Sequence, residues 1–264
     1  MAIIGILCFL YSYFIEPYRL QVNTFTIPTE KLSKASFKIV QISDLHCDKK
    51  QRNEPKLVKL INHTEPDIIV FTGDSINSLG ALGLFKKTLS SLKAKMSKLA
   101  VRGNIDIWYW SNVQLFEGTG FKVLDENSVT FDKDGEKITI SGLQCENESK
   151  LNKTLKDMPG EYFSIFLYHY PGLIESLENL NVDLYLCGHT HGGQIALPFY
   201  GALVTFARFG KKYEAGMYHV GDTDLYVNRG VGMDDGLAPR VRFLVRPEIA
   251  VFNIKPVGRN SSAE

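Results

Sequence analysis

The chain has 264 residues, enough for one large domain or two small ones. Apolar residues make up 44% and charged residues 22% of it, which excludes a disordered chain and is typical of a globular protein. The formal net charge is +1, so we expect no nucleic-acid partner. The four scattered cysteines form no CxxC pair and predict neither a disulfide framework nor a cysteine-type zinc site.

The first fifteen residues contain no charged side chain and are rich in isoleucine, leucine and phenylalanine. As a helix they would span about 22 Å, less than the ~30 Å hydrocarbon core of a membrane. A signal peptide would need a basic start and a small-residue cleavage site, and neither is clear. We therefore predict a membrane-associating segment over residues 1–20 and a single domain over 21–264. Basic residues after the segment favour the cytoplasmic side for that domain. A buried N-terminal helix is the alternative.

Further along, short apolar runs alternate with segments of helical spacing. The apolar runs predict strands at 37–43, 67–71, 99–101, 122–124, 128–131, 137–140, 163–168, 182–186, 225–228 and 249–254. The helical spacing predicts helices at 54–64, 80–97, 112–118, 149–157 and 172–180. This alternation predicts an α/β domain with a mixed sheet at its core.

Five of the predicted strands end in side chains that are common metal ligands. These side chains are Asp44 and His46, Asp74, Asn104, His169, and the pair His189 and His191. A single aspartate after a strand is most often a turn former or a helix cap. Five such endings together predict a site beyond the carboxyl ends of the strands, where α/β sheets bind their ligands.

The types of ligand indicate the chemistry. Cysteine is absent from the set, and a mixture of imidazole, carboxylate and amide oxygen suits Mn, Fe or Zn in an open site. Seven donors are too many for one tetrahedral ion and about right for two. The carboxylate of Asp74 can bridge two ions, since it has two oxygens. We therefore predict two divalent ions, with Mn favoured, in a site able to support phosphoryl transfer to water.

The motifs Asp44-x-His46, Gly73-Asp74, Gly103-Asn104, His169 and Gly188-His189-Thr190-His191 resemble, in order and spacing, those of the calcineurin-like metallophosphoesterase superfamily. The resemblance covers about residues 37–255. It implies a four-layer α/β/β/α sandwich of two mixed sheets, with a dinuclear metal site at one end. It also implies two ligand sets, with Asp74 as the bridge: Asp44, His46 and His191 for the first ion, and Asn104, His169 and His189 for the second.

The Gly-His-Thr-His-Gly-Gly-Gln form and the stretch Tyr226–Gly230 narrow the resemblance to a bacterial membrane-associated subgroup. That subgroup includes UDP-2,3-diacylglucosamine hydrolases of lipid A synthesis. The implied function is cleavage of a phosphodiester or pyrophosphate bond by metal-activated hydroxide, with conversion of UDP-2,3-diacylglucosamine to lipid X and UMP as one candidate. The implied partners are a phosphate-ester small molecule or lipid-linked nucleotide, and a membrane surface.

One position departs from the family pattern. The Gly-Asn motif usually continues with a histidine that helps to protonate the leaving oxygen, and here Ile105 follows instead. Asp106 could donate a proton only if burial raised its pKa. The catalytic candidates are therefore Asp74, Asn104 and Asp106, and Ile105 favours a pyrophosphate or other activated ester over an alkyl diester. The alternative is a metal-binding membrane protein with lost or weak hydrolysis that acts as a sensor or partner.

Two apolar stretches lie near the predicted ligands in sequence. Residues 108–110 read Trp-Tyr-Trp, and residues 197–209 are rich in aromatic and aliphatic side chains. Each alone fits an ordinary core, but together they predict an acyl-chain surface next to the metal site. Arg102 and Arg229 are weaker candidates for phosphate contacts, with surface salt bridges as the alternative.

Overall fold

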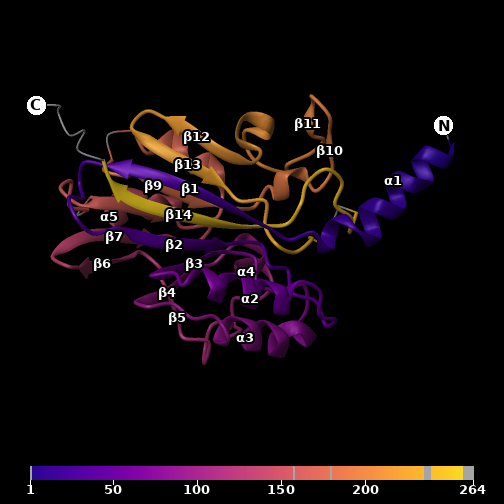
Figure 1. Ribbon diagram of the computed structural model, residues 1–264, viewed down its shortest axis with the longest axis horizontal. Coiled ribbons are helices and arrows are strands. Elements are labelled where there is room, and N and C mark those ends of the chain that lie inside the picture. Colours follow the sequence, from indigo (N-terminus) through magenta and orange to yellow (C-terminus); the bar gives the residue numbers. More distant parts are fainter. Residues whose placement is uncertain (1, 157, 179, 235–238, 258–264) are drawn as a thin grey trace, which may run out of the picture.

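The computed structural model describes residues 2–156, 158–178, 180–234 and 239–257, and it consists of two stacked six-stranded sheets with helices outside them (Figure 1). The first sheet has the strand order β1 (Gln21–Thr29), β14 (Glu248–Pro256), β2 (Phe37–Ile42), β3 (Ile68–Thr72), β4 (Ser97–Val101), β5 (Phe121–Val123). The second has the order β12 (Gly216–Val220), β13 (Thr223–Val227), β9 (Leu184–Cys187), β8 (Phe163–Leu167), β7 (Glu136–Gly142), β6 (Asn127–Lys133).

Both sheets are mixed. In the first, β2 to β5 run parallel, while β14 is antiparallel to β2 and parallel to β1. In the second, β7, β8, β9 and β13 run parallel, and the edge strands β6 and β12 are antiparallel to their neighbours. A separate two-stranded ribbon pairs β10 (Ala196–Leu197) with β11 (Gly201–Ala202).

Three apolar cores separate four layers. The middle core lies between the sheets, where Ile39, Val70 and Ile165 are fully buried. The helices α2 (Glu54–Thr64) and α3 (Leu82–Ser90) cover the outer face of the first sheet. The helix α5 (Leu151–Leu155) and the 3-10 turn η4 (Pro171–Ser176) cover the second. This is the α/β/β/α sandwich of two mixed sheets that the sequence predicts.

The topology gathers the polar strand endings at one end of the sandwich. The strands β2, β3 and β4 are mutually parallel, and so are β8 and β9. Because parallel strands end at the same edge, the loops that follow them converge. Gln41 joins the two sheets there, since its side-chain amide donates to Thr72 Oγ1 and to the carbonyl of Cys187, both at 2.9 Å.

Several elements differ from the sequence-based expectation. The predicted helix at 80–97 ends at Ser90, although Phe85, Leu89 and Leu92 of its apolar stripe are buried as expected. The segment 112–118, predicted as a helix, forms turns instead. Leu115 and Phe116 are buried against the α2–α3 layer, and Gly118 and Gly120 have positive φ. The remaining short helices are α4 (Asn104–Trp108) and the 3-10 turns η1 (Glu16–Tyr18), η2 (Leu79–Ala81), η3 (Glu148–Lys150), η5 (His191–Gly193) and η6 (Gly210–Tyr213).

The predicted N-terminal membrane anchor is wrong, and the cytoplasmic placement that rested on it falls with it. The apolar segment forms α1 (Ala2–Phe14), whose 13 residues extend about 20 Å. In the described part of the chain, no helix is both long and apolar enough to cross a membrane. The end of α1 packs on the domain, because the Ser12 carbonyl accepts from the backbone N–H of Arg242 at 3.0 Å and Tyr11 meets Phe243 edge to face. The division at residue 20 stays a prediction.

Candidate metal centre

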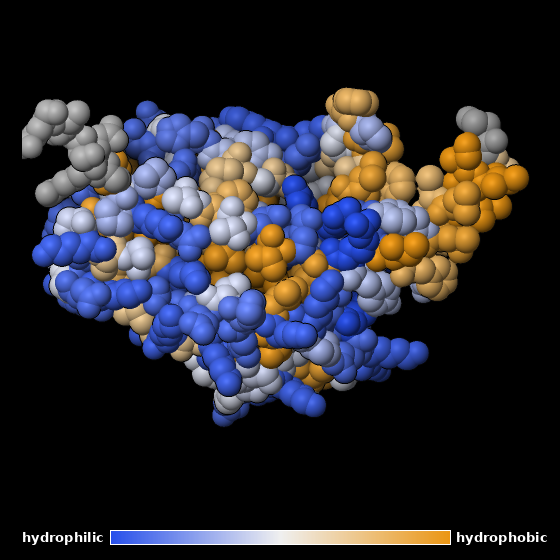
Figure 2. All heavy atoms as spheres, in the orientation of Figure 1, coloured by the Kyte–Doolittle hydropathy of each residue, from blue (hydrophilic) through white to orange (hydrophobic). Residues whose placement is uncertain are grey.

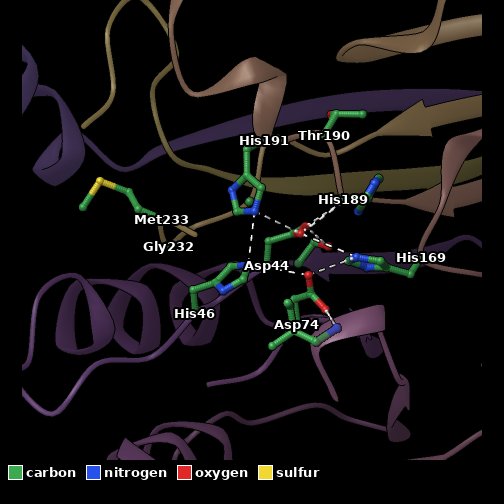
Figure 3. Close-up of polar contacts among 12 residues, drawn as sticks. Asp44, His46, Asp74, His169, His189, Thr190, His191, Gly232 and Met233 are labelled. Carbon is green, nitrogen blue, oxygen red and sulfur yellow. Dashed lines mark hydrogen bonds and ion pairs between the residues drawn. The ribbon is translucent and has the colours of Figure 1, made fainter. Parts of the chain in front are cut away.

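Six of the seven side chains predicted as ligands lie close together (Figure 3). They form two groups of three, and within each group the donor atoms lie within 4.8 Å of one another. The seventh, Asn104, is buried at the start of α4. The first group is Asp44, His46 and His191, and the second is Asp74, His169 and His189. The two histidines of the His-x-His pair therefore belong to different groups and do not face a single point.

Asp74 lies between the groups. Its Oδ2 is 3.2 Å from Nε2 of His169 and 3.6 Å from Nε2 of His46, which belong to different groups. Its Oδ1 accepts a hydrogen bond from the backbone N–H of Ile105 at 3.0 Å. The carboxylate is thus held in place with one oxygen directed at both groups, which is the geometry of a bridging ligand.

The backbone carries strain at these positions. Five of the six grouped residues have positive φ, from 37° at His46 to 72° at His189. Non-glycine residues rarely adopt this region, and such strain gathers at functional sites. The glycines beside them allow close approach: a Cβ added at Gly188 would lie 2.1 Å from Asp44 Oδ2, and one at Gly103 would lie 2.2 Å from Asp74 Oδ1.

Neighbouring groups orient two of the imidazoles. Nδ1 of His46 lies 2.8 Å from Oδ1 of Asn77, and Nδ1 of His169 lies 2.7 Å from the carbonyl of Thr72. Each contact places a proton on Nδ1 and leaves the Nε2 lone pair directed at the site. Such outer contacts accompany most metal-binding histidines. Asn77 also donates to the carbonyls of His46 and Met233, so it ties three segments together.

The buried polar atoms fit two cations. Nε2 of His169 and Oδ1 of Asn104 are buried and have no hydrogen-bond partner in the protein. Nε2 of His191 faces Nε2 of His46 at 3.2 Å, so two imidazole nitrogens converge there. Buried polar atoms without partners are costly, and a cation between them would satisfy these atoms at once. The residues therefore fit a dinuclear divalent metal site.

The protonation states differ among the four rings. Burial opposes a charge on His169, but Asp74 outweighs it and raises the pKa of that ring to about 9. Burial, together with the charges on His46 and Arg242, holds the pKa of His191 well below its usual range. Burial and the charge on His169 lower the pKa of His189 to about 4. Both rings are therefore neutral at pH 7, the form that binds metal. Burial opposes ionisation of Asp74, but His169 and His46 outweigh it and hold the pKa of that carboxyl well below its usual range.

Asp106, predicted as a catalytic residue, lies behind the ligands. It is fully buried, and its carboxylate accepts hydrogen bonds from the backbone N–H groups of Asp74, Ser75 and Gly103 at 2.9–3.1 Å. Burial and the charge on Asp74 raise its pKa to about 6. These contacts join the Asp74 and Asn104 loops, so the geometry gives Asp106 a positioning role rather than contact with a substrate.

A cavity of about 560 Å³ opens over the centre. Its floor includes His46, Asp74, Asn104, His189 and His191. Arg102 and Arg229, the predicted phosphate contacts, are not among the described residues that line the cavity. Arg229 instead pairs with Glu248, at 3.2 Å between Nη1 and Oε2, which is the salt bridge weighed as its alternative.

Sequence reasoning missed two residues that support the centre. Asn77 follows Asp74 by three residues and resembles an ordinary turn asparagine in sequence. Arg242 is fully buried, and its guanidinium donates to the carbonyls of Arg229 and Gly232 with Nη2 3.4 Å from Nδ1 of His191. It lies 51 residues from that histidine in sequence, so no local spacing indicates the contact.

Comparisons with known proteins agree with this geometry. The family described as calcineurin-like phosphoesterase matches residues 37–193. An uncharacterised metallophosphoesterase of Bacillus subtilis, YkuE, is 37% identical over 93% of this chain and 89% of its own. The Escherichia coli phosphodiesterase YaeI is 27% identical over 92% of each chain. Among solved structures, GAP50, the anchor in the inner membrane complex of Plasmodium, has a similar fold. Its TM-score is 0.54 at 14% identity, over 83% of this chain and 81% of that one.

Proposed function

Because the chain belongs to the calcineurin-like phosphoesterase family and is therefore a metal-dependent phosphoester hydrolase, we propose that it cleaves phosphodiester or pyrophosphate bonds. The E. coli relative that is named a phosphodiesterase supports this choice of bond. We propose two divalent ions as cofactors and favour Mn, because the donors are imidazoles, carboxylates and one amide oxygen.

One observation carries the proposal: Asp74 is directed at two groups of ligands on the floor of an open cavity. When bound, two divalent ions supply Lewis-acid stabilisation of the phosphoryl oxygens and lower the pKa of a water molecule. A centre closed by protein on all sides would serve structure alone.

The protein's own groups have separate parts in this reaction. His46 and His169, with their Nδ1 protons held by Asn77 and Thr72, present Nε2 to the ions in fixed directions. Asn104 presents its unpartnered Oδ1 from the first residue of α4. Asp106 holds the Asp74 and Gly103 turns in register through the backbone. The centre is therefore preorganised, and little energy is needed to arrange it during the reaction.

The leaving group is constrained by Ile105, which lines the cavity next to Asn104. Its side chain carries no proton, and the carboxyl of Asp106 faces backbone N–H groups instead of the cavity. A leaving oxygen of low pKa needs little protonation. We therefore propose activated esters and phosphoanhydrides as the preferred substrates. UDP-2,3-diacylglucosamine, which combines a phosphoanhydride with apolar chains, is the specific candidate to test.

The test is hydrolysis of bis-p-nitrophenyl phosphate by the purified full chain with added Mn²⁺. We expect turnover that a chelator abolishes and that Mn²⁺ restores. The Asp74→Ala variant should lose roughly 10³-fold or more in kcat/KM, because both groups lose their shared ligand. Two bound Mn²⁺ ions per chain without turnover of any diester or pyrophosphate would overturn the proposed function.

A further inference from the structure

Apolar side chains form two sides of the cavity over the metal centre, and most of them are exposed to solvent. Ile105, Trp108 and Tyr109 form one side, and Val204 and Phe206 form the other. We refer to these five residues as the apolar rim. Trp108 is 57%, Tyr109 67% and Phe206 59% exposed. Large apolar groups gathered around a polar floor mark a ligand site rather than a core.

The first side of the rim is tied to the ligands by one short helix. Asn104 and Trp108 are the first and last residues of α4, four positions apart, so their side chains lie on the same face of the helix. The indole N–H of Trp108 donates to Glu146 at 3.2 Å, which fixes the ring over the cavity. The ring therefore keeps a set position relative to Asn104.

The second side is tied to the second ligand group. Phe206 lines the cavity together with His189, a member of the second ligand group. This side belongs to an apolar loop that follows β11 and joins the apolar surface around β10 and β11 (Figure 2). The two sides thus line the same cavity as His189, which is only partly buried.

The charges of the cavity limit what the rim can bind. The described residues that line it include no lysine and no arginine, so the protein offers a bound phosphoryl group no cationic side chain there. The metal ions would meet the phosphoryl charge, and a substituent held between the two sides of the rim would meet hydrocarbon. This arrangement disfavours a highly charged substituent and favours an apolar one.

We propose that the rim binds an apolar substituent of the substrate, on the phosphoryl oxygen that is not the leaving group, and that Trp108 and Phe206 determine this specificity. The inference rests on the proposed function, since it names a substrate class for that reaction. An acyl or alkyl chain and an aryl ring share the required chemistry, and the experiment below separates them.

The test uses p-nitrophenyl diesters that share one leaving group and carry a methyl, hexyl or phenyl substituent. Because the departing group is constant, a difference in kcat/KM reports how the substituent is bound. We expect the hexyl or phenyl ester to exceed the methyl ester by at least about tenfold in the wild type. A higher value for hexyl would indicate an alkyl chain, and a higher value for phenyl an aryl ring. Equal kcat/KM values for all three esters would overturn the inference.

The chain supplies a matched control. Phe199 lies in the turn between β10 and β11, and Phe206 lies in the loop that follows β11. Both have positive φ, and Phe199 is fully exposed outside the described cavity lining. Trp108→Ala and Phe206→Ala should each reduce the ratio of the preferred ester to the methyl ester at least threefold, roughly the loss of part of one aromatic contact. Phe199→Ala should leave the ratio as in the wild type. If Phe199→Ala reduces the ratio as much as Phe206→Ala does, the rim is not the binding surface.

A binding measurement separates this inference from the proposed function. Diphenylphosphinate and dimethylphosphinate each carry a single charge and have no ester bond to hydrolyse. The Mn-loaded protein should bind the diphenyl compound at least about tenfold more tightly, and Trp108→Ala should remove most of that difference. Selective binding of the diphenyl compound without hydrolysis of any ester would contradict the proposed function but not the role of the rim. Ester hydrolysis together with equal affinities for the two phosphinates would contradict the role of the rim but not the proposed function.

Discussion

The two ligand groups differ in how the protein surrounds them. Asp44, His46 and His191 are all buried, and Asn77 and Arg242 stand behind the two rings. In the second group His189 is only partly buried, although His46 and His191 of the first group line the open cavity as well. The first group is therefore built to retain an ion in a fixed geometry. The second is built to leave part of the coordination sphere to substrate and water.

The difference between the two ligand groups can be tested by removing one histidine from each group. His191→Ala should weaken Mn²⁺ binding at the first group by at least about 100-fold, because it removes a buried ring from the less exposed of the two groups. His189→Ala should cost about tenfold, because water can enter the open position. The measurement is Mn²⁺ titration of the metal-free protein, with kcat followed at saturating Mn²⁺. Equal losses for the two variants, or the reverse order, would contradict the distinction.

A smaller effect should come from the contact behind His46. Asn77→Ala removes the acceptor of the Nδ1 proton, and we expect Mn²⁺ affinity at the first group to fall roughly 10-fold. The second group should keep its affinity, since His169 is held by the Thr72 carbonyl. Asn77→Asp should restore much of the loss because a carboxylate also accepts that proton. A uniform loss at both groups, without rescue by aspartate, would indicate general destabilisation instead.

The pattern of the sequence could predict an α/β domain and the polar side chains that gather at its strand ends, because strand endings are local signals. The four-layer sandwich came only from the family resemblance. Asp74 and His169 each follow a continuous apolar run, and parallel strands bring such endings together. The sequence could not predict that Asn77 faces His46, or that Arg242 lies against His191, because the partners are distant in sequence.

Other expectations failed for equally physical reasons. Apolar residues 1–15 indicated an anchor, yet the helix they form is too short to cross a membrane. The phosphate contact of Arg229 stays a prediction, although the buried Glu248 pairs with this residue and the described cavity lining does not include it.

The most direct test of the central claim, that Asp74 is shared by two ion sites, is anomalous scattering from crystals of the full chain grown with Mn²⁺. We predict two peaks per chain: one among Asp44, His46 and His191, the other among Asn104, His169 and His189, with Asp74 in contact with both. A single peak, or two peaks of which only one contacts Asp74, would contradict the account.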